Sequence, residues 1–137
     1  SELEIEITET ILVRHGEAGD NQLQRIRDLG VTVAIDDFGT EYSSLSYLTD
    51  LPFDTLKIDR SFVRGMQDGN RAMAAVVRAI IGLARELDKH VVAEGVESMT
   101  EVAWLADLGC HTIQGYVYHR PLHAAALAEV LRRAAYA

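Results

Sequence analysis

Residues 31–39 read Val-Thr-Val-Ala-Ile-Asp-Asp-Phe-Gly, a short apolar run that is followed at once by two carboxylates. The part from Val31 to Ile35 is short for a helix and rich in β-branched residues, and both properties favour a β-strand. Asp36 and Asp37 would then follow the end of a buried strand. Because successive strand residues point in opposite directions, we expect both carboxylates to reach one site only where the strand gives way to a loop.

Similar runs elsewhere bring the expected strands to five: Leu3 to Ile7, Val31 to Ile35, Thr55 to Ile58, His90 to Ala93 and His111 to Ile113. The expected helices are Gln22 to Leu29, a short helix with Leu45, Leu48 and Leu51, Met73 to Leu87 with Asn70 as its cap, a helix after the capping box of Ser98 and Glu101, and a last helix through Leu127, Val130 and Leu131. Strands that alternate with helices predict an α/β fold with parallel strands. Five strands fit either an open doubly wound sheet or part of a (β/α)8 barrel.

The composition is that of a globular domain, with 137 residues, 48% of them hydrophobic and 25% charged. By size alone this is one compact domain. No apolar run reaches the roughly 18 residues that a membrane span needs, so we expect no direct membrane insertion. The single cysteine, Cys110, and the lack of a signal peptide favour a cytoplasmic setting, which a membrane-tethered parent protein would also provide.

The net charge of −8 comes from 21 acidic against 13 basic residues. A nucleic-acid polymer would meet overall repulsion, so it is not an expected partner. A small phosphate ligand that is reached through a divalent cation is compatible with this charge, because clustered carboxylates are what hard cations require.

Polar residues stand at the ends of all five expected strands: Glu6, Asp36 with Asp37, Lys57, Glu94 and Gln114. In parallel α/β folds this edge of the sheet binds ligands. Helix capping would explain one such residue, but it is a weak explanation for five strand ends. A set of mostly carboxylates favours Mg²⁺ or Mn²⁺ over zinc. Adjacent aspartates could bridge two metal ions about 4 Å apart, as in phosphodiester hydrolysis, and a lysine nearby would orient the water or offset phosphate charge.

These residues resemble the EAL-domain phosphodiesterases, which hydrolyse cyclic di-GMP to the linear dinucleotide pGpG. Five strings match in family order: Glu6-Ile-Thr-Glu9, Ala34-Ile-Asp-Asp-Phe-Gly-Thr40, Leu56-Lys-Ile-Asp-Arg60, Val91-Val-Ala-Glu-Gly-Val-Glu97 and Gln114-Gly-Tyr116 with Pro121. The resemblance implies part of a TIM-type (β/α)8 barrel, with residues 1–137 as the C-terminal portion of the domain, about strands four to eight. The Glu-Ala-Leu motif itself and the asparagine ligand of the family are absent from this sequence.

The resemblance implies a two-metal site for Mg²⁺ or Mn²⁺ whose first half is incomplete in this chain. Glu6 and Asp36 match ligands of the first metal, and Asp36 bridges to the second. Asp37 and Glu94 match residues around the second metal, in part through water.

Catalytic and binding roles follow from the same resemblance. Lys57 matches the residue that contacts the catalytic water, and Gln114 matches one that contacts that site or the substrate phosphate; with Glu94 these form the implied catalytic set. Glu97 matches a position associated with guanine recognition, and Glu9 one that steadies the loop after the paired aspartates.

The loop from Phe38 to Ser44, which includes Gly39, Thr40 and Glu41, resembles the mobile segment that links the metal site to dimerisation. Glu41 stands where the family has glycine. That departure favours an alternative function, an inactive EAL-like module that binds cyclic di-GMP or a protein partner, whereas the intact carboxylates and lysine favour hydrolysis. We also expect a homodimer, or association through the open edge of a partial barrel.

Overall fold

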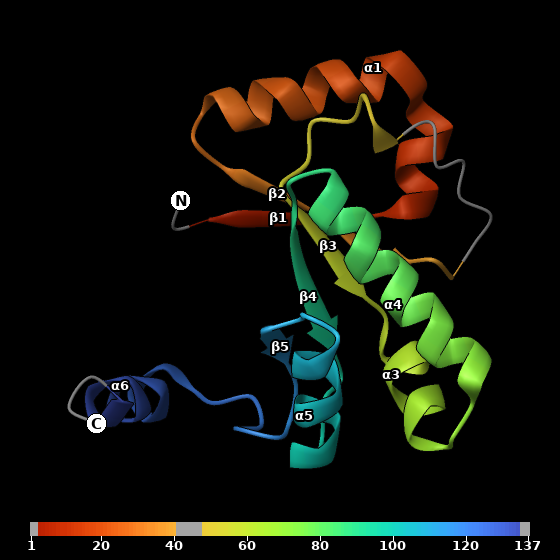
Figure 1. Ribbon diagram of the computed structural model, residues 1–137. Coiled ribbons are helices and arrows are strands. Elements are labelled where there is room, and N and C mark those ends of the chain that lie inside the picture. The colour runs from red at the N-terminus through yellow and green to blue at the C-terminus, as the bar shows by residue number, and fades with distance from the viewer. Residues whose placement is uncertain (1–2, 41–47, 135–137) are drawn as a thin grey trace.

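The computed structural model describes residues 3–40 and 48–134, apart from the side chains of residues 12–18, 20 and 134. Its elements are β1 (Glu4–Thr8), α1 (Glu9–Asp28), β2 (Thr32–Phe38), β3 (Thr55–Ile58), α3 (Arg60–Gln67), α4 (Arg71–Glu86), β4 (His90–Glu94), α5 (Met99–Asp107), β5 (Thr112–Gln114) and α6 (Ala124–Ala134). The strands form one parallel sheet in the order β1-β2-β3-β4-β5 (Figure 1). Strand order therefore follows chain order, which results when each βαβ unit adds its strand on the same side of the sheet.

Helices cover the outer face of this sheet. Helix α1 contacts β1 and β2, α4 contacts β3 and β4, and α3 contacts α4 and β4. The apolar core lies between the strands and these helices, and its most buried members are Val33, Ile35, Leu56, Ile58, Phe53, Val63, Val77, Val96 and Leu105. Figure 1 shows α6 set apart from this packed layer, beyond β5.

The inner face of the sheet is polar. All four residues of β3 are buried, and they alternate: Leu56 and Ile58 join the apolar core, whereas Lys57 forms ion pairs on the opposite face. On that same inner face Thr55 Oγ1 donates to Glu4 Oε2 over 2.9 Å. Parallel sheets are usually apolar on both sides, so this polar face marks the position of the site.

The amino end of the sheet is held by an ion pair. Arg27 Nη2 lies 2.7 Å from Asp54 Oδ1, and Asp54 Oδ2 accepts a 2.9 Å hydrogen bond from the backbone N–H of Val33. Burial acts to raise the pKa of Asp54, but these hydrogen bonds and the charges of Arg27 and Lys89 outweigh it, so the pKa lies below its ordinary value. This contact joins α1 to the sheet far from the carboxyl edge.

Two helix starts confirm the expected caps. Asn70 Oδ1 accepts hydrogen bonds from the first N–H groups of α4, and Ser98 forms a complete capping box with Glu101 at the start of α5. The expected helix Gln22 to Leu29 is too short, because α1 already begins at Glu9. The sequence analysis also missed α3. The helix expected around Leu45 lies largely outside the described residues.

Strand β2 is longer than expected, because it continues through both aspartates to Phe38. Its pairing with β3 shifts register between Ile35 and Phe38, and Asp37 has a φ of 55°. The expected end of the strand at Ile35 is therefore wrong. A bulge within the strand, and not its end, breaks the alternation of side chains at the two aspartates.

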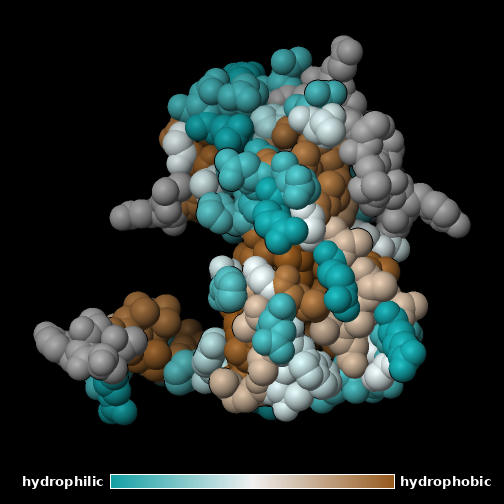
Figure 2. All heavy atoms as spheres, in the orientation of Figure 1, coloured by the Kyte–Doolittle hydropathy of each residue, from teal (hydrophilic) through white to brown (hydrophobic). Residues whose placement is uncertain are grey.

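Two surface properties complete the description. Among the described residues, no helix is both long enough and apolar enough to cross a membrane. Apolar atoms are nevertheless exposed on α6, at the lower left of Figure 2, where Leu127 and Leu131 are exposed.

Candidate functional site

A buried lysine lies among carboxylates at the carboxyl edge of the sheet. Lys57 Nζ is 2.5 Å from Glu6 Oε1 and 2.5 Å from Glu94 Oε1. It is also 3.2 Å from Asp36 Oδ1. The lysine side chain is only 3% exposed, whereas that of Glu6 is 46% exposed, so solvent reaches the cluster from the β1 side. The sheet thus brings together charged side chains from four consecutive strands.

Three carboxylates in this cluster could hold a cation. Asp36, Asp37 and Glu94 each offer an oxygen, and these oxygens lie within 4.8 Å of one another. Asp36 Oδ1 is buried, and it has no hydrogen-bond partner among the described residues, although it is in ion-pair contact with Lys57. A buried carboxylate oxygen without a hydrogen bond is costly, and a cation is one group that would satisfy it.

The β2 bulge explains how adjacent aspartates reach the same place. In a regular strand Asp36 and Asp37 would point to opposite faces. The φ of 55° at Asp37 and the register shift beside it turn the second carboxylate toward the first. Thr40 stabilises this turn, because its Oγ1 donates a 2.8 Å hydrogen bond to the carbonyl oxygen of Asp37.

The charges of the cluster shift one another's ionisation. Burial raises the pKa of Asp37, and the nearby charges of Asp36 and Asp59 raise it further. Burial also raises the pKa of Glu94; Lys57 opposes this rise without cancelling it. For Lys57, burial acts to lower the pKa, but the surrounding carboxylates outweigh burial and hold that pKa above its ordinary value. Lys57 therefore stays protonated. A bound cation would stabilise the ionised forms of Asp37 and Glu94, whose pKa values are raised in its absence.

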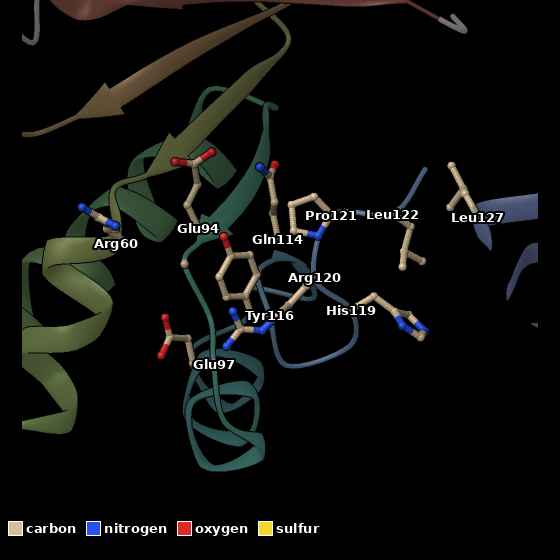
Figure 3. Close-up of a pocket in the computed structure, with 12 residues that line it drawn as sticks. Arg60, Glu94, Glu97, Gln114, Tyr116, His119, Arg120, Pro121, Leu122 and Leu127 are labelled. Atoms are coloured by element: carbon tan, nitrogen blue, oxygen red, sulfur yellow. The ribbon is translucent and has the colours of Figure 1, made fainter. Parts of the chain in front are cut away.

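A pocket of about 490 Å³ continues from this cluster along the sheet edge (Figure 3). Glu94 and Gln114, which are paired in register on β4 and β5, line it on the cluster side. Beyond them the wall consists of Arg60, Gly95, Glu97, Gly115, Tyr116, His119, Arg120, Pro121, Leu122 and Leu127. The volume lies within the range of small-molecule sites. The carboxylate cluster and the pocket are therefore adjacent, and Glu94 belongs to both.

The loop after the aspartates is tied to the start of α1. Glu9 is buried, and its Oε2 accepts a 3.2 Å hydrogen bond from the backbone N–H of Gly39. Gly39 has a φ of 88°, a conformation that glycine adopts without strain. Phe38 packs in the apolar core. Glu41, like residues 42–44 of the expected mobile loop, lies outside the described residues.

The sequence analysis missed the cationic and aromatic part of the pocket. Arg60 begins α3, while Tyr116 and Arg120 belong to the segment between β5 and α6. The acidic residues were identified because they lie at the ends of expected strands. None of these three residues ends a strand, so they were not selected. Glycines offered a signal: Gly115 directly precedes Tyr116 and approaches the Val96 backbone, and Gly95 lies against Arg60, contacts that a Cβ at either glycine would block.

Residues 1–121 match the family profile of the EAL domain. The chain belongs to the EAL domain family. This EAL chain is 48% identical, over 95% of its length, to the cyclic di-GMP phosphodiesterase NbdA of Pseudomonas aeruginosa, of which it covers 16%. The family membership expected from the five sequence strings is thereby confirmed.

Solved structures give the same assignment. The EAL chain superposes on the PaMucR phosphodiesterase of Pseudomonas aeruginosa in complex with cyclic di-GMP, with a TM-score of 0.86 and 42% identity over 91% of this chain and 50% of that one. It also superposes on Klebsiella pneumoniae BlrP1, solved with manganese and cyclic di-GMP, with a TM-score of 0.76 and 37% identity over 86% of this chain and 30% of that one. The chain thus spans half or less of these relatives. Its fold is confirmed as α/β, a partial TIM-type barrel with five parallel strands, which excludes the open doubly wound sheet.

Proposed function

We propose that the full-length protein carrying this EAL chain hydrolyses cyclic di-GMP to linear pGpG. Residues 1–137 would supply about strands four to eight of its barrel and most of a two-metal site. The observation that carries the proposal is the cluster of Glu6, Asp36, Asp37 and Glu94 around Lys57, at the edge where barrel enzymes place their catalytic groups. The names of NbdA and PaMucR support the substrate and the reaction.

The donor set fits a hard divalent cation. All the candidate ligands are carboxylate oxygens, which Mg²⁺ and Mn²⁺ prefer, and buried Asp36 Oδ1 accepts no hydrogen bond among the described residues beside its ion-pair contact with Lys57. Glu6 and Asp36 would hold the first ion, and Asp36, Asp37 and Glu94 the second. Bound there, the ions would make water a better nucleophile and stabilise negative charge on the phosphate. BlrP1, solved with manganese, supports this class of ion.

The remaining residues act on water and substrate. Water adds to one phosphorus of the ring, the bond from that phosphorus to a ribose 3′ oxygen breaks, and the proton from water ends on that oxygen. Lys57, which stays protonated in its cluster, would orient the water and offset phosphate charge. Gln114 stands beside Glu94 and would donate to the phosphate. Glu97, further along the pocket, would accept hydrogen bonds from guanine.

The decisive experiment is turnover of cyclic di-GMP by the full-length protein. We expect linear pGpG to form with Mg²⁺ or Mn²⁺, and the rate to fall by at least about 10³-fold in excess EDTA, because the lost charge stabilisation is worth several kcal/mol. Chromatography of the nucleotides measures both rates. Rapid turnover in EDTA would contradict the metal site.

The same sample tests the alternative of an inactive binding module. Titration calorimetry with cyclic di-GMP would show binding without product if the protein is a sensor. The clustered carboxylates argue against this, because like charges held together raise one another's pKa and destabilise the ionised site, as at Asp37. Binding without product at saturating Mg²⁺ and Mn²⁺ would replace the proposed function by the sensor.

Location and assembly are part of the proposal. The buried, unpaired thiol of Cys110 supports a reducing, cytoplasmic setting. The sheet described here ends in two edge strands, β1 and β5, and unpaired edges favour association with another chain. We therefore expect this 137-residue chain to sediment as a dimer or larger species. A compact monomer in sedimentation velocity would contradict that expectation.

A further inference from the structure

The segment that joins β4 to α5 carries one pocket residue at each end. Glu94 ends β4, and Glu97 directly precedes Ser98, the N-cap of α5. Both glutamates line the pocket, and Figure 3 shows their side chains at the two ends of this segment. The position of Glu97 relative to Glu94 therefore depends on how the backbone of residues 95–98 is held.

A buried carboxylate holds the far end of this segment. Glu101 lies in the first turn of α5 and is only 4% exposed, although it carries a charge. Its Oε2 accepts a 2.8 Å hydrogen bond from the backbone N–H of Glu97 and another of 2.8 Å from that of Ser98. Hydrogen bonds to an ionised carboxylate are stronger than those between neutral groups. A side chain that does not line the pocket thus fixes the backbone of one that does.

One of these two hydrogen bonds is not needed to start the helix. The capping box consists of the bond from Ser98 N–H to Glu101 Oε2 and the 3.2 Å bond from Glu101 N–H to Ser98 Oγ. The bond from Glu97 N–H lies outside this box, because Glu97 precedes the cap. It therefore acts on the β4–α5 segment and not on the helix.

The near end of the segment is held by different contacts. Glu94 belongs to β4 and pairs in register with Gln114 of β5. The backbone N–H of Val96 donates to the carbonyl oxygen of Gln114 over 3.2 Å, and the N–H of Val117 donates to the carbonyl oxygen of Val96 over 3.0 Å. None of these contacts involves Glu101. Removing the Glu101 carboxylate should therefore release Glu97 and leave Glu94 in place.

We propose that Glu101 is a positioning residue for substrate binding, because it holds Glu97 where that residue contacts cyclic di-GMP. The inference rests on the proposed function, in which Glu97 binds guanine and Glu94 belongs to the metal site. Glu101 touches neither substrate nor metal and acts through Glu97 alone. A group that is already ordered avoids part of the entropy cost of binding. The loss of Glu101 should therefore weaken binding and leave the chemical step nearly unchanged.

The test uses the full-length protein and two measurements, the dissociation constant for cyclic di-GMP by calorimetry in EDTA and steady-state hydrolysis with Mn²⁺. We expect Glu101→Ala to raise the dissociation constant and KM by about tenfold, the scale of ordering one side chain on binding, with kcat changed by less than about threefold. Glu101→Gln should restore most of the binding, because its amide oxygen can accept the same two hydrogen bonds and glutamine also forms capping boxes.

The matched control is Asn70→Ala. Asn70 Oδ1 caps α4 by accepting from the N–H groups of Ala72 and Met73, over 3.0 and 3.3 Å, and the described lining of the pocket includes no residue of α4. Losing this cap should lower the midpoint of thermal unfolding, as Glu101→Ala does, without changing the dissociation constant or KM. An equal rise of KM in both variants would overturn the inference.

A double-mutant cycle decides whether Glu101 acts through Glu97. In a Glu97→Ala protein, Glu101→Ala should change the dissociation constant by less than about twofold, because the group that it positions is gone. A tenfold change in both backgrounds would overturn the inference and leave the proposed hydrolysis standing. Binding without hydrolysis in the wild type would overturn the proposed hydrolysis, and the cycle would still decide the role of Glu101.

Discussion

Asp36→Asn should lower the rate of cyclic di-GMP hydrolysis by at least about 10³-fold while leaving the free energy of unfolding within about 1 kcal/mol of the wild type. Asparagine keeps the shape of the side chain but removes its charge, and an amide is a poor ligand for two cations at once. Asp36 Oδ1 has no hydrogen bond to lose among the described residues. The lost contact with Lys57 is offset because Asp36 also raises the pKa of Asp37 by repulsion.

The control for Asp36→Asn is the same substitution at Asp54. Asp54 accepts from Arg27 and Val33 at the amino end of the sheet, so Asp54→Asn should cost about 2 kcal/mol of stability and leave kcat unchanged. Because its folded pKa is lowered, the stabilisation by Asp54 is present above the unfolded pKa of about 3.9 and is lost as pH falls through the folded pKa. Denaturant titration and hydrolysis assays measure both variants. An active Asp36→Asn protein would remove Asp36 from the proposed site.

Lys57→Met should reduce both the stability of the protein and the rate of hydrolysis. Added divalent ions should restore the stability but not the rate. Methionine fills a similar volume without charge, so Glu6, Asp36 and Glu94 would lose a buried counter-charge. Removing one partner from a buried ion-pair cluster costs about 3 kcal/mol. Mg²⁺ or Mn²⁺ can replace that charge, so the midpoint of thermal unfolding should rise more with added metal than in the wild type.

Hydrolysis should stay about 10²-fold to 10⁴-fold below the wild type at saturating metal, because no group then orients the water. The chain offers a matched control in Lys89, the other of its two lysines. Lys89 Nζ lies 5.1 Å from the Phe53 ring centroid, outside the carboxylate cluster, so Lys89→Met should cost about 0.5–1 kcal/mol with no dependence on metal. Equal metal responses in the two variants, or full activity of Lys57→Met, would refute the role of Lys57.

The acidic part of the site was predictable because each of its residues lies at or near the end of an expected strand. Each short apolar run is visible in the sequence, and parallel strands bring their carboxyl ends to one edge. Glu94 and Lys57 could therefore be placed together without coordinates. The caps of α4 and α5 were predictable for a similar reason, since Asn70 and Ser98 act on backbone groups within three residues of themselves.

The bulge at Asp37 was not predictable in the same way. It depends on how β2 pairs with β3, a contact between residues distant in sequence, and a positive φ is uncommon for any single non-glycine residue even though aspartate adopts it more readily than most. The length of α1 was missed because Gly16 and Gly19 interrupt its apolar pattern. The wall formed by Tyr116 and Arg120 was missed because a connecting segment carries no periodic signal.

The alternation of side chains on β3 has a consequence for protein engineering. Leu56 and Ile58 belong to the apolar layer under the helices, and Lys57 belongs to the polar inner face. Neighbouring positions of the strand therefore contribute to different properties of the protein, core packing on one face and the candidate site on the other. In a saturation scan of this strand, substitutions at Leu56 and Ile58 should lower the yield of folded protein, whereas substitutions at Lys57 should lower turnover as well as stability. Changes on opposite faces with no shared neighbours combine nearly additively. Stabilising substitutions in the helix-facing layer can thus be introduced without changing the residues that act on substrate in the barrel interior.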